Sequence, residues 1–159
     1  MRAASRRLRG FTLVEMMVTI AIAAILGLMV VPNLIDMVDS GKTSVLVNKF
    51  PQDVAWARNQ AVTTQLPVVI TLGPTACTWS TSVGGTVSAE HSMTLAQLNA
   101  NYPNVTCTIT GGNAQTLTFD HQGFINTAPT ITVTAKQGQT WTLQVLASGS
   151  VILNANTAS

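Results

Sequence analysis

One carboxylate, that of Glu15, lies inside the longest apolar run of the chain. The run extends from Phe11 to Val31, 21 residues that include no other ionisable side chain. As a helix it would be about 30 Å long, which matches the apolar core of a bilayer. A carboxylate in such a segment costs about 2.5–3.5 kcal/mol near the helix centre and less near its end. Glu15 therefore needs a partner of opposite charge.

The segment before this run, residues 1–10, is basic. It holds four of the eight Lys and Arg residues of the chain: Arg2, Arg6, Arg7 and Arg9. Because basic flanks stay in the cytoplasm, this predicts that the rest of the chain lies across the membrane. Without the segment, four basic side chains face six acidic ones. The basic net charge therefore does not indicate a nucleic-acid-binding surface.

The apolar run has two ordinary interpretations. A cleavable secretory signal has a shorter apolar core, about 7–15 residues, followed by a small-residue cleavage site. Here the run is longer, and no clear site of that kind appears before Pro32. A plain membrane anchor is the other interpretation, and Glu15 argues against it.

The residues around Gly10 resemble the prepilin signature of the type IV pilin class. After the basic leader they read Gly10-Phe11-Thr12-Leu13-Val14-Glu15-Met16-Met17. The resemblance implies that a prepilin peptidase cleaves between Gly10 and Phe11 and that the new Phe11 amine is methylated. Glu15 is then expected to pair with that amine, in its own chain or in a neighbouring subunit, and to guide register during assembly.

Cys77 and Cys107 are the two cysteines of the chain. An even number of cysteines in an exported domain favours a disulfide, and two buried free thiols are the alternative. Closing a loop of about 30 residues would stabilise the fold by roughly 3–4 kcal/mol in the chain-entropy model.

The N-terminal part of the chain, which includes Glu15, is expected to be helical. Residues 11–32 are predicted to form a transmembrane and filament-core helix, and residues 33–65 an amphipathic helix with apolar residues at helical spacing. Pro51 is expected to kink or break the second helix, because proline removes a backbone hydrogen bond.

The spacing of apolar residues along the sequence changes after Leu66. Thr106–Thr110 reads Thr-Cys-Thr-Ile-Thr, and Thr130–Thr134 reads Thr-Ile-Thr-Val-Thr. Such alternation is typical of half-buried strands. Residues 66–159 are therefore predicted to form six to eight antiparallel strands, in one curved sheet or in two. The expected fold class is α+β, with the long helix packed on this β-rich region.

Later segments resemble the FimT/GspH group of minor pilins. Trp56–Val62 is similar to the helix that precedes the first strand in that group. Phe119–Gly123, and later Leu143–Val145 with Ser148–Val151, are similar to its paired strand-turn blocks. The resemblance covers nearly the whole chain and implies a minor pilin that assembles with other pilins.

Two histidines follow acidic residues: His91 follows Glu90, and His121 follows Asp120. A metal or acid–base site is conceivable there, but two histidines without a third ligand motif are more often solvent-facing loop residues. Phosphate-binding, serine-hydrolase, zinc-protease and Cys-x-x-Cys motifs are absent from the sequence. We expect a protein that is not an enzyme, with no catalytic residue, metal or cofactor.

DNA is the remaining candidate partner. Some FimT-like minor pilins bind DNA through a basic motif near the C-terminus, but the matching segment here, Ser148–Asn154, has no arginine. Lys136 is the only basic residue after Leu66. Because phosphate contacts supply most non-specific affinity for DNA, binding by this subunit would depend on Lys136.

The sequence thus predicts a minor pilin held in the inner membrane, with its body in the periplasm, that joins a type IV pilus and supports pilus biogenesis. Support of DNA uptake in natural transformation is a further role. A type II secretion pseudopilin and a DNA-binding receptor subunit of a competence pilus are the alternatives that the sequence leaves open.

Overall fold

The computed structural model describes residues 11–73, 77–110, 116–136 and 138–156. They form two helices and eight strands in this order: α1 (Leu13–Thr64), β1 (Val68–Leu72), β2 (Trp79–Val83), β3 (Thr86–Met93), α2 (Leu95–Asn101), β4 (Thr106–Thr110), β5 (Thr116–Phe119), β6 (Thr130–Thr134), β7 (Thr140–Val145) and β8 (Val151–Asn156). The chain divides into two compact units at the Val38–Asp39 bond. We call the first the N-terminal unit and the second the body, and describe each by itself.

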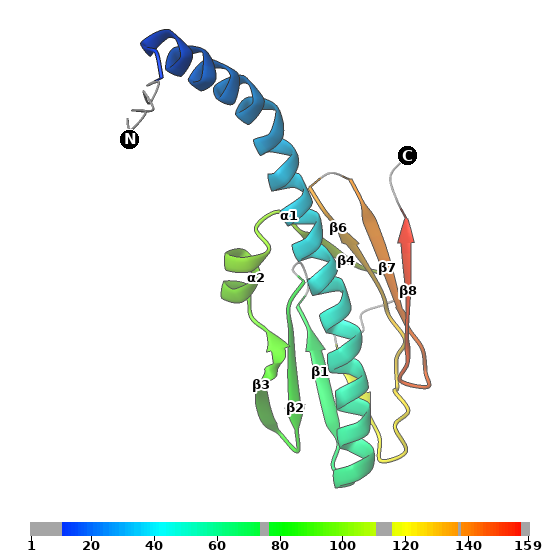
Figure 1. Ribbon diagram of the computed structural model, residues 1–159. Helices are drawn as coiled ribbons and strands as arrows, with labels where there is room; N and C mark the ends of the chain where they lie inside the picture. The colour runs from blue at the N-terminus through cyan, green and yellow to red at the C-terminus, as the bar shows by residue number, and fades with distance from the viewer. Residues whose placement is uncertain (1–10, 74–76, 111–115, 137, 157–159) are drawn as a thin grey trace, which may run out of the picture. The chain divides into compact units, whose positions relative to one another are not determined.

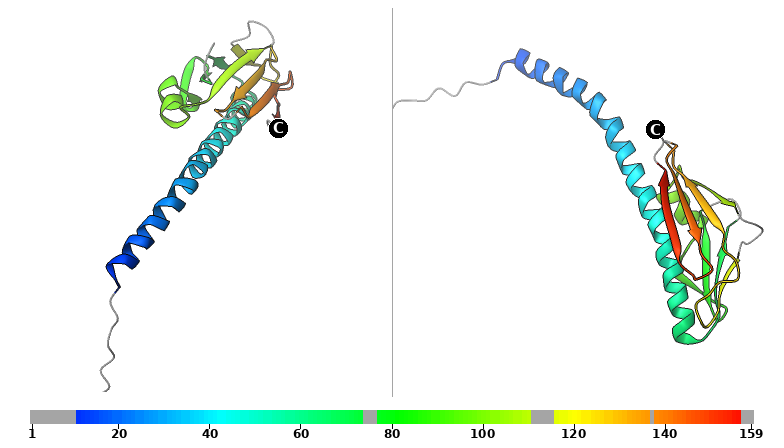
Figure 2. Two further views of the ribbon diagram at one scale, coloured as in Figure 1. Left: turned by 90° about the horizontal axis from the view of Figure 1, so that it is seen from above. Right: turned by 90° about the vertical axis from the view of Figure 1, so that its right-hand side faces the viewer.

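Two antiparallel sheets make up the body, and part of α1 lies along them (Figure 1). The first sheet has the strand order β3-β2-β1-β5, and the second has the order β4-β6-β7-β8. The expectation of an α+β fold with antiparallel strands is confirmed, and of the two arrangements left open the structure has two sheets (Figure 2).

The core of the body forms where one face of α1 meets both sheets. Leu46, Phe50, Val54, Ala57 and Ala61 recur at helical spacing, and all are buried. The inward positions of the strands complete this core: Val68, Ile70, Leu117, Phe119, Val133, Leu143 and Val145. Side chains on one face recur about every 3.6 residues in a helix and every 2 residues in a strand. Apolar residues at these spacings therefore give each element one apolar face, and these faces meet in a common interior.

A kink or a break of the helix was expected at Pro51, and the structure excludes the break. α1 runs without interruption from Leu13 to Thr64. Proline lacks one backbone donor, but the side chains on both sides of it, Val47, Phe50 and Val54, are buried in the core. Their packing holds the helix together across the missing hydrogen bond. A kink at Pro51 stays a prediction.

α1 ends where the backbone turns left-handed at Gln65, with φ of 57°. The Gln65 N–H donates to the Ala61 carbonyl at 3.1 Å. Such a left-handed residue is a common helix terminator, and Pro67 follows it.

The helix α2 was not foreseen in the β-rich region. Its N-cap is Thr94, whose hydroxyl accepts the Gln97 N–H at 3.3 Å, while the Gln97 carboxamide accepts the Thr94 N–H at 3.0 Å. The sequence pattern Thr-x-x-Gln is typical of such a reciprocal capping box and could have predicted the start of this helix.

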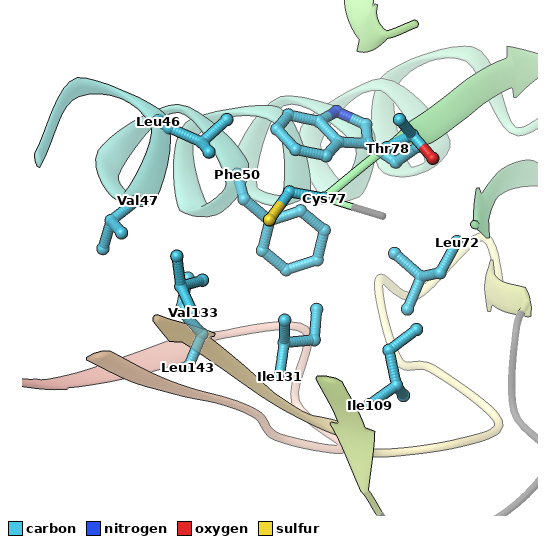
Figure 3. A pocket seen from close by; sticks show the side chains of 11 residues that line it. Leu46, Val47, Phe50, Leu72, Cys77, Thr78, Ile109, Ile131, Val133 and Leu143 are labelled. Atoms are coloured by element: carbon cyan, nitrogen blue, oxygen red, sulfur yellow. The ribbon is translucent and has the colours of Figure 1, made fainter. Parts of the chain in front are cut away.

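A small apolar cavity of about 30 Å³ lies inside the body, between α1 and the two sheets. Figure 3 shows Phe50 of α1 above Ile131 and Leu143 of the second sheet, with Cys77 beside it. This volume is about the share of one water molecule in the liquid, and a buried water needs about two to four polar partners, whereas Thr78 carries the one hydroxyl group among the lining residues. The cavity is therefore a packing void and not a ligand site.

Candidate assembly site

The N-terminal unit exposes apolar side chains all around its helix. Among them are Leu13, Met17, Ile20, Ile25, Leu28 and Val30, each at least half exposed, with Leu28 at 80%. A soluble helix normally has one polar face, whereas a helix that is apolar on every side is buried among other helices or in lipid. Exposed apolar surface on this scale marks an interaction surface. Among the described residues, no helix combines the length and apolarity that crossing a membrane requires.

Thr12 directly precedes α1, and its side chain binds the backbone at Glu15. The Glu15 N–H donates to the Thr12 hydroxyl oxygen at 3.2 Å, as at a helix N-cap. Glu15 thus lies in the first turn of α1, where the helix dipole favours a negative charge. Within the described ranges, its carboxylate has no hydrogen-bond or ion-pair partner. The motif therefore leaves Glu15 able to bind a cation from outside its own helix.

The processing site is described only in part. Gly10 and the leader lie outside the described residues, and Phe11 is 76% exposed just before the helix. Cleavage between Gly10 and Phe11 and methylation of Phe11 stay predictions.

The predicted disulfide between Cys77 and Cys107 is present, with a Cα–Cα distance of 5.2 Å. Cys77 precedes β2 of the first sheet, and Cys107 lies in β4 of the second. Both side chains are buried. The bridge therefore joins the two sheets across the core.

We expect the double variant Cys77→Ser with Cys107→Ser to lose roughly 3–4 kcal/mol of stability, because its unfolded state has no closed loop. Thermal unfolding of the full chain in detergent, followed by tryptophan fluorescence, measures the loss. A reducing agent should lower the melting temperature of the unmodified protein and leave that of the double variant unchanged. Equal sensitivity of the two proteins would contradict the structural role of the bridge.

Two turns of the body pack against each other through glycines. Gly123 and Gly149 both have positive φ, 82° and 73°. A Cβ added at Gly149 would lie 2.7 Å from the Gly123 carbonyl oxygen and 3.1 Å from a ring carbon of Phe119. The side chain of Arg58 on α1 approaches both glycines. The two sequence blocks that contain these glycines are therefore one structural unit.

This paired arrangement lies within the part of the chain that matches a known family. Residues 46–149 match GspH, described as type II transport protein GspH. This match spans more than half of the chain. The chain belongs to the GspH family. Residues 5–31 also match the prokaryotic N-terminal methylation motif. Together the two matches confirm the resemblance to type IV pilin-like proteins that the sequence indicated.

Two crystal structures of the type IV minor pilin FimU from Pseudomonas aeruginosa (strain PAO1) resemble this GspH-family chain. One has 16% identity and a TM-score of 0.52, covering 77% of this chain and 98% of the FimU chain. The other has 17% identity and a TM-score of 0.49, covering 72% and 98%. The first likeness shows that the fold is shared. No curated protein matches the chain at a significant level.

The glycine contact of this GspH-family body predicts a selective effect of Gly149→Ala. Gly138 has a similar φ of 79° but nothing within 4 Å of an added Cβ, so Gly138→Ala is a matched control. Gly138→Ala should cost about 1–2 kcal/mol for the left-handed backbone alone. Gly149→Ala should cost about 1–3 kcal/mol more, because the methyl group meets Gly123. Chemical denaturation compares the two variants, and equal losses would contradict the packing.

Asp53 is the residue that sequence reasoning missed. It lies in the segment predicted as an amphipathic helix, where a charged side chain is expected on the solvent face, but it is only 3% exposed. Its Oδ2 accepts hydrogen bonds from Lys49 Nζ at 3.0 Å and from Trp79 Nε1 at 2.9 Å, and its Oδ1 lies 3.1 Å from His91 Nδ1. The buried carboxylate therefore ties α1 to β2 and β3.

His91 was expected to face solvent in a loop, and this is wrong. It lies in β3, contacts Asp53, and stacks on Trp56 of α1 with ring centroids 3.7 Å apart. His121 is exposed in a turn. Across the described residues, no three His, Cys, Asp or Glu side chains are grouped so that they could hold a metal ion.

The basic side chains of the body are spread apart. Lys136 is exposed in the turn between β6 and β7. Arg58, on α1, instead lies beside Gly149, which is in the turn after β7. β7 has six residues, so about 20 Å separates its two ends. The other two basic residues are on α1: Lys49 is engaged by Asp53, and Lys42 is exposed 16 residues, about 24 Å, before Arg58. These positions do not converge on one groove, which argues against the DNA-binding surface considered for Lys136.

Proposed function

We propose that this GspH-family chain is a minor subunit of a type IV pilus and supports pilus biogenesis. The observation that carries the proposal is the helix of the N-terminal unit, which exposes apolar side chains on every side and begins with the methylation motif. Such a helix gains stability by packing among similar helices. The role is structural and not enzymatic.

Before assembly, we infer, the chain is held in the inner membrane as a single-pass protein with its body in the periplasm. One feature of the sequence and one of the structure support this topology. The apolar run Phe11–Val31 follows a leader with four arginines, and basic flanks stay in the cytoplasm. Cys77 and Cys107 form a disulfide, which is stable in an oxidising compartment such as the periplasm.

A prepilin peptidase is the proposed processing partner. It would remove residues 1–10, and with them all four leader arginines, and leave Phe11 as the new N-terminus. The Phe11 amine would then be the cation for Glu15. In a low-dielectric helix bundle this attraction would favour one axial register between neighbouring subunits.

A deletion strain tests the role in the pilus. We expect loss of surface pili, and with it loss of DNA uptake if the host is naturally transformable, while protein secretion continues. In this proposal DNA uptake depends on the filament, because the basic residues of the body are spread apart. Restoration of piliation by the wild-type gene is the control.

The second candidate function is that of a pseudopilin in type II secretion. The matched family, type II transport protein GspH, favours it. The same deletion strain separates the two functions: arrested export with normal piliation would support the pseudopilin and overturn the pilus subunit.

A further inference from the structure

β8 forms an edge of the second sheet that has the means to pair with another strand. All six of its residues, Val151–Asn156, pair with β7 in unbroken antiparallel register. No further strand pairs with its other side within the described part of the chain. Figures 1 and 2 show β8, coloured red, at the margin of its sheet. A free row of backbone N–H and C=O groups therefore remains along it.

The first sheet protects its edges, whereas β8 has no such protection. At β3 the register with β2 shifts, and the strand carries Glu90 and His91. At β5, Asn126 accepts the Thr118 N–H, and Thr127 donates to the Thr116 carbonyl. Charges, bulges and covering segments are the usual means of blocking edge pairing, and β8 has no charge, proline or register shift. An edge left open in this way favours an interface.

The inner face of β8 is incompletely covered. Leu153 lies opposite Leu143, and although Leu143 is 1% exposed, Leu153 is 37% exposed. Ala155, on the same face, is exposed opposite Trp141. A strand added beside β8 would bury these apolar groups and would satisfy the free backbone groups at the same time.

We propose that β8 binds an extended strand of a different subunit of the same filament, so that the second sheet continues across the subunit boundary. The inference rests on the proposed function. Only another extended backbone can pair with a whole row of alternating donors and acceptors. Since the N-terminal helices would hold neighbouring bodies together at high effective concentration, a modest contact at the edge would suffice.

A second copy of β8 is not the expected occupant. Two β8 edges would pair antiparallel around a two-fold axis. Within the body, α1 and β8 run in nearly opposite directions, as both figures show. A two-fold axis would therefore point the α1 helices of two copies in opposite directions, whereas the head-to-tail contacts that build a filament keep its subunits in one direction. The partner strand belongs to a different pilin-type subunit.

Ala155→Pro tests the proposal. At the hairpin before β8, the Leu146 N–H donates to the Ser150 carbonyl at 2.8 Å. In an antiparallel ladder, hydrogen-bonded pairs alternate with pairs that are not hydrogen-bonded. Because Leu146 and Ser150 form a hydrogen-bonded pair, Trp141 and Ala155, five positions along, form a pair without hydrogen bonds. The Ala155 N–H therefore points to the free edge and not to β7. Proline at this position therefore removes a docking donor and leaves the β7 ladder intact. Ala155→Thr, which keeps the N–H, is the matched control.

The readout is a photoreactive residue in place of Asn154, in the full chain expressed in its native strain. We expect a crosslink to a strand of another subunit that carries an N-terminal methylation motif. The crosslink should fall more than tenfold with Ala155→Pro and persist with Ala155→Thr. An unchanged melting temperature confirms that each variant is folded.

A second photoreactive residue, in place of Leu28, reports on packing of the N-terminal helices. Crosslinks from position 28 with none from position 154 would overturn the inference and leave the proposed function intact. A crosslink from position 154 to a second β8, or one unaffected by Ala155→Pro, would also overturn the inference. Absence of crosslinks at both positions would contradict the proposed function itself.

Discussion

Glu15→Gln is expected to leave the chain in the membrane but to reduce its presence in sheared filaments more than tenfold. Glutamine keeps the size of the side chain and removes its charge. Two unit charges about 4 Å apart attract by roughly 4 kcal/mol at an effective dielectric constant of about 20. About 1.4 kcal/mol of such attraction already corresponds to a tenfold change in an equilibrium. Quantitative immunoblotting of filament and membrane fractions measures the effect.

Thr19→Ala is the matched control for this variant. The Thr19 hydroxyl donates to the Met16 carbonyl of its own helix at 2.9 Å and is exposed. Because this contact stays within one chain, its loss should not change incorporation into filaments. Wild-type incorporation of the Glu15→Gln variant would show that the carboxylate does not set the register.

Asp53→Ala is expected to destabilise the body by about 3–5 kcal/mol, since it removes one partner of a buried charged network. The indole N–H of Trp79, which is 5% exposed, would lose its acceptor. The ammonium of Lys49 would lose its carboxylate and keep only the Glu90 carbonyl, at 3.1 Å. Unfolding of the full chain in detergent measures the loss, and tryptophan fluorescence reports on the environment of the site, since Trp56 and Trp79 both lie there.

Glu90→Ala is the control for a change of charge without a change of buried contacts. The Glu90 side chain is exposed, and its backbone carbonyl, which binds Lys49, is unaffected by the substitution. A surface change of this kind should stay within about 0.5 kcal/mol of the wild type. If Asp53→Ala behaved like Glu90→Ala, the carboxylate would not be a tie between α1 and the first sheet.

The parts of the fold that local periodicity encodes were predictable. The alternation in Thr130–Thr134 defined a strand with one buried face, and the disulfide between Cys77 and Cys107 followed from the cysteine count and the exported context. The pairing of strands into two sheets instead of one was left open, because it depends on contacts between residues far apart in the sequence.

The network around Asp53 could not be predicted, because its members come from three separate elements. His91 is 38 residues from Asp53, and Trp79 is 26 residues from it. One signal was nevertheless present: Asp53 lies three residues after Phe50 and four before Ala57, on the face of α1 that packs in the core. A carboxylate at such a position must have donors around it.

At Pro51, packing of the neighbouring side chains outweighs the low helix propensity of proline. Proline is unfavourable inside a helix by about 3 kcal/mol, and this alone predicted a kink or a break. Burial of Phe50 and Val54 on either side of it offsets that cost. For the candidate assembly site, the opposite holds: Gly10, Phe11 and Glu15 form a short contiguous motif, so the sequence alone identified it. The action proposed for it lies between chains and not within one.

Mass spectrometry of the N-terminus of the protein from native envelopes tests the central claim most directly. The account predicts a chain that begins with N-methylated Phe11 and retains the apolar helix after it. A chain that still carries Arg2–Arg9, or one from which Phe11–Val31 has been removed, would contradict it.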